Sequence, residues 1–140
     1  ENFKITEVSQ SNPIIAQRVW LAHLTLGETL WDLERYEESY ASLLEVTRCL
    51  PPAHPKWGVT LNNTIALAIE VKDDERLLEL FEHLFRRSDT QLEMFYFRLE
   101  HLIAHQRLDD ARTLLTWALK TSSRVKKDDQ TRSFRDQLGL

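Results

Sequence analysis

Residues 24–52 read LTLGETLWDLERYEESYASLLEVTRCLPP, and this stretch describes two helices folded back on each other. Apolar and small residues recur at helical spacing on both sides of a short polar turn. Pro51 then stops the second helix, because proline lacks the N–H group that a continuing helix needs. We therefore predict helices over residues 14–33 and 36–50, packed as an antiparallel hairpin.

The same offsets return twice further along the chain. Leu43 of the first hairpin corresponds to Phe81 and then to Leu115, at intervals of 38 and 34 residues. The corresponding positions are Gly27, Leu30, Tyr36, Ser39, Leu43 and Val46; Ile65, Ala68, Asp74, Leu77, Phe81 and Leu84; and Leu99, Leu102, Leu108, Ala111, Leu115 and Ala118. The repeats predict an all-α chain of three hairpins, with the further helices over residues 57–71, 75–87, 91–105 and 108–121.

The two ends of the chain lie outside the repeats. Residues 1–11 have weak periodicity and read as a lead-in segment, and the repeat domain is assigned to residues 12–125. Residues 126–140 are mostly charged, and we expect a capping helix there, with a connector to a further domain as the alternative. Because the chain opens at Glu1 without an initiator methionine or an apolar signal segment, we expect a domain excised from something longer.

Composition narrows the class of protein. The 140 residues are 42% hydrophobic and 29% charged, which is typical of one globular domain. The formal net charge of −4 argues against a nucleic-acid binder, which would carry a clustered basic surface. No apolar run reaches the length of a membrane span, and we expect a cytoplasmic location.

The pattern of residues 20–53 resembles the tetratricopeptide repeat (TPR) family, whose period is 34 residues. Gly27 stands where the two helices of a hairpin approach closely, Ser39 fits under the first helix, and Pro51 closes the unit. The third copy, about residues 92–125, resembles the family most in its second helix. The resemblance implies three stacked antiparallel hairpins and a C-terminal capping helix, wound as a right-handed αα-superhelix (solenoid).

The chain departs from the family pattern in two respects. The middle copy, about residues 58–91, places Ile65 and Leu77 where the family has small residues, which should open the angle between helices. The turn glycine typical of the family is also missing. The residues in its place are Glu34, Lys72 and Gln106.

The resemblance further implies a concave groove lined by the first helix of each hairpin. The groove positions that we single out are Leu24, Glu28, Trp31, Asn62, Ile69, Tyr96 and Glu100. Their mixture of acidic and apolar side chains favours a protein or peptide partner with basic and apolar residues. The alternative is that the carboxylates of Glu28 and Glu100 form an ordinary solvated face.

No catalytic constellation is evident in the sequence. His101 and His105 are spaced to share a metal ion on one helix, but no third ligand stands at a recognised spacing, so we expect neither a metal nor a cofactor. Within the run Phe95-Tyr96-Phe97, at least one ring should be exposed, because neighbours on a helix point in different directions.

The expected function is a non-catalytic protein- or peptide-binding scaffold, as the regulatory or sensing part of a larger signalling or transcription-regulating protein. Two alternatives remain open. One is a stand-alone secretion-type chaperone that holds an unfolded client segment. The other is a self-association domain, which would build a homo-oligomer.

Overall fold

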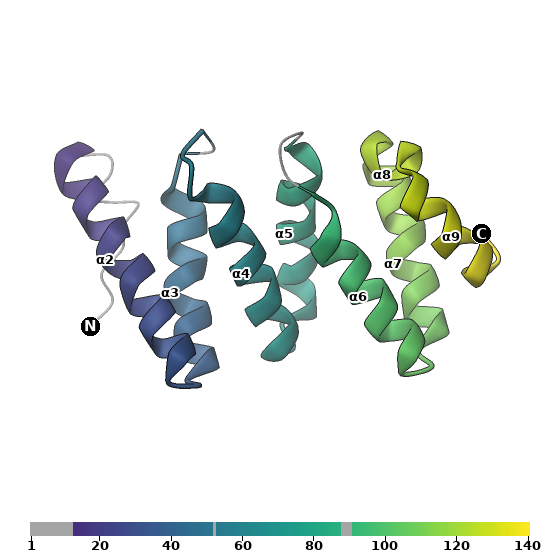
Figure 1. The fold of residues 1–140 in the computed structure, drawn as a ribbon, viewed down its shortest axis with the longest axis horizontal. Coiled ribbons are helices and arrows are strands. Elements are labelled where there is room, and N and C mark those ends of the chain that lie inside the picture. Colours follow the sequence, from purple (N-terminus) through teal and green to yellow (C-terminus); the bar gives the residue numbers. More distant parts are fainter. Residues whose placement is uncertain (1–12, 52, 88–90) are drawn as a thin grey trace. The chain divides into compact units, whose positions relative to one another are not determined.

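The computed structural model describes residues 13–51, 53–87 and 91–140, which form eight helices and contain no strand (Figure 1). The prediction of an all-α chain is confirmed, and the six helices predicted over the repeats end within two residues of the observed bounds. The predicted lead-in segment lies outside the described residues. The helices are α2 (Pro13–Asp32), α3 (Tyr36–Cys49), α4 (Trp57–Glu70), α5 (Asp74–Arg86), α6 (Glu93–Ala104), α7 (Leu108–Thr121), α8 (Ser123–Lys127) and α9 (Asp129–Leu138).

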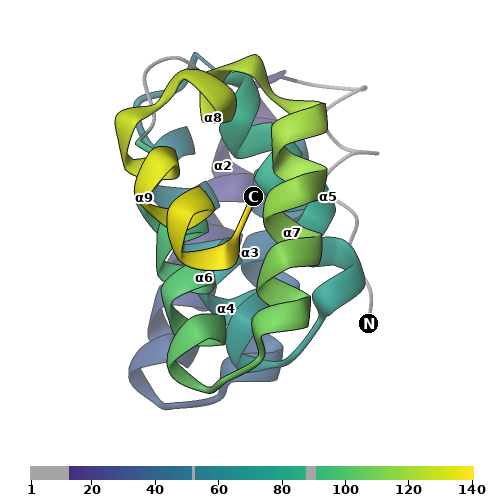
Figure 2. The same cartoon turned by 90° about the vertical axis from the view of Figure 1, so that its right-hand side faces the viewer.

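The chain divides into two compact units, Glu1–Leu77 and Leu78–Leu140, and the division falls inside α5. In the first unit α2 packs along α3, and α3 packs against α4. In the second unit α6 packs against α7, while α8 and α9 both contact α7 (Figure 2). Within the described residues, no helix combines the length and the apolar character needed to cross a membrane.

The positions that correspond between the three repeats are buried in every copy, except for the set of Tyr36, Asp74 and Leu108 at the start of each second helix, where Tyr36 is half-buried and the other two are exposed. Leu43, Phe81 and Leu115 are each at most 1% exposed. The other buried sets are Gly27, Ile65 and Leu99; Leu30, Ala68 and Leu102; Ser39, Leu77 and Ala111; and Val46, Leu84 and Ala118. The register read from the sequence is therefore correct at these positions.

Gly27 lies where α2 and α3 approach each other closely. A Cβ atom added at Gly27 would lie 2.6 Å from Cδ2 and 2.8 Å from Cγ of Leu43. Two serines of α3 donate hydrogen bonds to main-chain carbonyls of α2 across this contact, from Ser39 Oγ to Gly27 O over 2.6 Å and from Ser42 Oγ to His23 O over 3.1 Å. The helices can approach this closely because Gly27 has no side chain.

The three hairpin turns share one backbone conformation. Glu34, Lys72 and Gln106 all have a left-handed backbone, with φ of 58°, 62° and 60°. In each turn, the N–H of the third residue beyond the helix end donates back to a carbonyl five residues earlier, as in a Schellman motif. These bonds run from Arg35 N to Leu30 O (2.9 Å), from Asp73 N to Ala68 O (2.9 Å) and from Arg107 N to Leu102 O (2.8 Å).

Glycine at any of these three turns is expected to stabilise the protein. The left-handed backbone strains a residue with a Cβ atom. Glycine removes this strain, and the free energy gained exceeds the cost of the entropy that glycine adds to the unfolded chain. Lys72→Gly should raise the free energy of unfolding by about 0.5–1 kcal/mol in urea denaturation. The matched control is Glu70→Gly at the end of α4, which should lower the free energy of unfolding by about as much. A lower free energy of unfolding for both variants would contradict the prediction.

Side chains also bind the helices to one another within each unit. In the first, Tyr40 Oη of α3 donates to Asp73 Oδ2 over 2.8 Å, and burial together with this bond raises the pKa of Tyr40. In the second, Arg124 of α8 donates to Leu84 O and Arg87 O at the end of α5. The guanidinium thus lies where the carbonyls at the end of a helix carry partial negative charge.

A candidate binding pocket between α6 and α9

The region predicted as one capping helix contains two short helices. Ser122 Oγ accepts from Val125 N over 3.2 Å and begins α8, and Asp128 Oδ1 accepts from Gln130 N over 2.9 Å and begins α9. Two capping side chains lie within a few residues of each other, so the chain starts a helix twice. The boundary that the sequence suggested between residues 125 and 126 falls inside α8.

One face of α9 is anchored to the helices before it. Thr131, Phe134 and Leu138 are buried, and the Phe134 ring stacks on Tyr96 of α6 with ring centroids 5.4 Å apart. The hydroxyl groups of Tyr96 and Thr131 share a 2.9 Å hydrogen bond, and Arg112 Nε of α7 donates to Leu138 O over 3.0 Å. These contacts hold α9 beside α6 and α7 (Figure 2).

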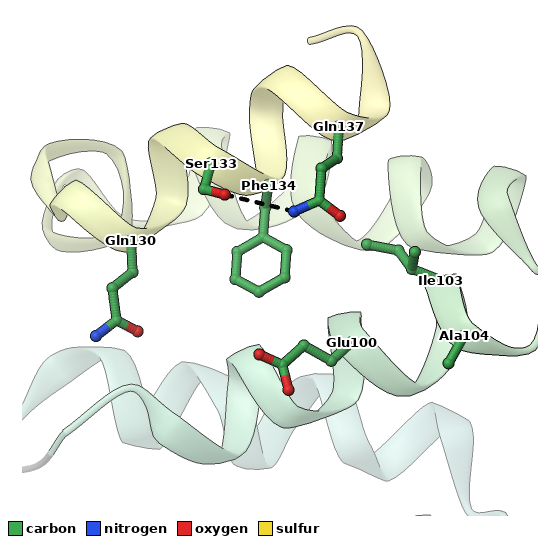
Figure 3. A pocket seen from close by; sticks show the side chains of 7 residues that line it. All are labelled: Glu100, Ile103, Ala104, Gln130, Ser133, Phe134 and Gln137. Carbon is green, nitrogen blue, oxygen red and sulfur yellow. Dashed lines mark hydrogen bonds between the residues drawn. The ribbon is translucent and has the colours of Figure 1, made fainter.

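A pocket of about 380 Å³ opens between α6 and α9 (Figure 3). On each helix, the lining residues follow one another at steps of one, three or four positions, which keeps them on one face. They are Glu100, Ile103 and Ala104 of α6, and Gln130, Ser133, Phe134 and Gln137 of α9.

The pocket combines one carboxylate, one aromatic ring and several neutral polar groups. Glu100 and Phe134 point toward each other from the two helices (Figure 3). Within the described part of the chain, no cation forms an ion pair with Glu100, whose side chain is exposed. Gln137 Nε2 donates to Ser133 Oγ over 3.4 Å, which leaves the Gln137 amide oxygen available as an acceptor.

The basic residues of this region line a different cavity. That cavity has a volume of about 360 Å³ and lies along α8, α9 and Leu140. It is lined by Lys126, Lys127, Asp128, Arg132, Arg135, Asp136 and Leu140. The pocket between α6 and α9 therefore has Glu100 as its one charged lining residue.

Two of the predicted groove residues are buried inside the chain. Leu24 is 3% exposed and Tyr96 is 5% exposed, so neither side chain offers an open surface to a partner. Tyr96 is covered because α9 packs over it. Its burial raises the pKa of the Tyr96 hydroxyl to about 12, so the hydroxyl is neutral at physiological pH.

The other predicted groove residues are at least partly accessible. In the first unit Glu28 is exposed, whereas Trp31, Asn62 and Ile69 are half-buried. The Trp31 ring lies edge-on to Tyr36 with centroids 6.4 Å apart, and Asn62 Oδ1 is buried without a hydrogen-bond partner. Of the predicted residues, Glu100 is the one that lines the pocket of the second unit.

Sequence reasoning missed the half of the pocket that α9 supplies, namely Gln130, Ser133, Phe134 and Gln137. Residues 126–140 were predicted to be a capping helix or a connector, and the polar face of such a segment is expected to contact only solvent. One signal was present: two glutamines lie seven residues apart on either side of Phe134, and this spacing places all three on one helical face.

Two further expectations concern α6. Phe95 is fully buried whereas Phe97 is 50% exposed, which confirms that the aromatic run does not all face inward. His101 and His105 have ring centroids 4.2 Å apart, and His105 Nδ1 donates to His101 O over 2.9 Å. Residues 13–51, 53–87 and 91–140 contain no group of three His, Cys, Asp or Glu placed to hold a metal ion.

A comparison with protein-family models, with curated proteins and with solved structures finds no match to this chain.

Proposed function

We propose that this domain is a non-catalytic module that binds an extended peptide segment of a partner protein, with the α6/α9 pocket as part of its binding surface. In this proposal the three repeats form TPR-like hairpins wound as a right-handed superhelix, with α8 and α9 as the cap. Such a module suits the regulatory or sensing part of a larger signalling or transcription-regulating protein.

The repeated geometry of the turns supports the superhelix. Equal turns join the first and second helix of each hairpin, and the same hydrogen bond recurs after α9, from Leu140 N to Arg135 O over 2.8 Å. Gly139 is left-handed there, with φ of 70°. Helix α9 thus ends as α2, α4 and α6 do, but its Arg135 is partly exposed where they have buried apolar residues. A polar outer face of this kind is typical of the cap of a repeat array.

The observation that carries the binding proposal is the Glu100 carboxylate, which lies opposite Phe134 and forms no ion pair with any described residue. A carboxylate accepts charge-assisted hydrogen bonds from a cationic side chain, and these are stronger than hydrogen bonds between neutral groups. The amides of Gln130 and Gln137 offer both donors and acceptors, which suit the main chain of an extended peptide. The pocket thus has a charged group for recognition, an apolar wall and polar groups for the backbone.

A display library of short random peptides tests the proposal. We expect the domain to enrich peptides with basic and apolar residues, and Glu100→Lys to weaken the selected peptides by about tenfold or more. The matched control is Glu79→Lys on the exposed side of α5, which changes the net charge equally but does not touch the pocket. Affinity should also fall with added salt in the unmodified domain.

If peptides are enriched but Glu100→Lys does not change their affinity, the pocket is not part of the binding surface. An empty selection, combined with a molecular mass that rises with protein concentration, would favour the self-association alternative. The half-exposed Phe97 ring would then be the first residue to examine, because exposed aromatic rings are enriched in interface cores.

A further inference from the structure

We propose that the α6/α9 pocket is selective for arginine, and that it accepts a guanidinium group in preference to a lysine ammonium group. This inference rests on the proposed function, since it names the residue of the partner that enters the pocket. It is carried by three features of the lining: the number of acceptors, the aromatic wall and the position of the cations.

The pocket is rich in hydrogen-bond acceptors. Glu100 supplies two carboxylate oxygens, and Gln130 and Gln137 each supply an amide oxygen. A guanidinium group carries five N–H donors in a planar fork and binds a carboxylate through two parallel bonds. It can therefore pair with Glu100 and still donate to the amide oxygens, whereas an ammonium group has three donors around a single atom.

The apolar part of the lining fits the remainder of an arginine side chain. Ile103 and Ala104, which are at least partly accessible, form most of the apolar wall, and Phe134 adds the 7% of its surface that stays exposed. Figure 3 shows the Phe134 ring directed toward Glu100. A guanidinium group is more weakly hydrated than an ammonium group, so it packs more readily against this wall and against the exposed part of the Phe134 ring. The volume of about 380 Å³ exceeds that of one side chain, so the neighbouring part of the peptide has room as well.

The arrangement of charge on α9 favours a cationic occupant. Gln130, Ser133 and Gln137, which face the pocket, are neutral. Arg132 and Arg135 line the separate cavity instead, together with the lysines of α8. An arriving cation thus meets the Glu100 carboxylate, with no cation among the lining residues.

The test uses capped single amino acids as probes, titrated into isotope-labelled domain and followed by NMR chemical shifts. N-acetyl-arginine methylamide should shift the signals of Glu100, Ala104, Gln130 and Gln137. The lysine analogue should bind several-fold more weakly, and the citrulline analogue, which is neutral and nearly the same shape, about tenfold more weakly. Glu100→Gln should weaken arginine binding by about tenfold or more, while Glu79→Gln should leave it unchanged.

Equal shifts with arginine and citrulline, or with arginine and lysine, would overturn the inference. The outcome for the proposed function is separate. Selected peptides could lose affinity for the Glu100→Lys variant but keep their affinity for the unmodified domain when their arginines are replaced by lysine. This result would support peptide binding at the pocket and exclude arginine selectivity. If the arginine probe binds but the library yields no peptide, the pocket is an arginine site and the proposed peptide-binding function is wrong.

Discussion

Phe95→Ala is expected to lower the free energy of unfolding by about 3–5 kcal/mol, the range typical of a phenylalanine removed from a packed core. The Phe95 ring is fully buried in the second unit. It meets Phe81 and Phe85 of α5 edge-on, with ring centroids 5.4 Å and 5.1 Å apart. Alanine would lose these contacts and leave a cavity that rigid helices cannot close.

Urea denaturation followed by circular dichroism measures this loss. The matched control is Phe97→Ala, two residues further along α6, because Phe97 is half exposed and leaves no internal cavity. The control should change the free energy of unfolding by less than about 1 kcal/mol. Similar values for the two variants would show that Phe95 is not part of the core.

Gly27→Leu is expected to destabilise the first hairpin by roughly 1–3 kcal/mol, because the new side chain overpacks the contact between α2 and α3. Even its Cβ atom would lie 2.6 Å from Cδ2 of Leu43, closer than side chains can approach. Separating the helices to make room would also stretch the hydrogen bond from Ser39 Oγ to Gly27 O.

A second substitution makes this prediction specific. Leu43→Ala should destabilise the unmodified protein, but in the Gly27→Leu background it removes the group that clashes, so the two effects should not add. Ala22→Leu, on the exposed side of α2, is the control for inserting a leucine and should have little effect. An unchanged melting temperature for Gly27→Leu would mean that the helices do not meet at this residue.

Much of the fold could be predicted from the sequence because the core is formed at regular helical spacing. Leu43, Phe81 and Leu115 could be assigned to the core from their offsets alone, and all three are buried. The missing glycines were also informative. Lys72, for example, was placed where the family has a turn glycine, and it adopts the backbone conformation that glycine favours.

The candidate site was harder to predict because it depends on which helix packs over which. Tyr96 lies on the helix face that was assigned to the groove, but α9 covers that face and Tyr96 became part of the core. Periodicity identifies which face of a helix is apolar, but it does not identify the helix that packs against that face. Asp128, in contrast, is a recognisable cap, so the division between α8 and α9 could have been predicted from local sequence.

The polar face of α9 bears on how an array of this kind can lengthen in evolution. Leu30, Ala68 and Leu102 are buried beside the turns that follow their helices, whereas the corresponding residue of α9 is Arg135. A hairpin duplicated onto α9 would have to bury the Arg135 guanidinium group, whose Nε donates to Leu140 O over 3.3 Å but which forms no ion pair among the described residues, at a large free-energy cost. In the proposed repeat array, gene duplication would therefore succeed more readily next to a helix whose corresponding residue is apolar, as Leu30, Ala68 and Leu102 are.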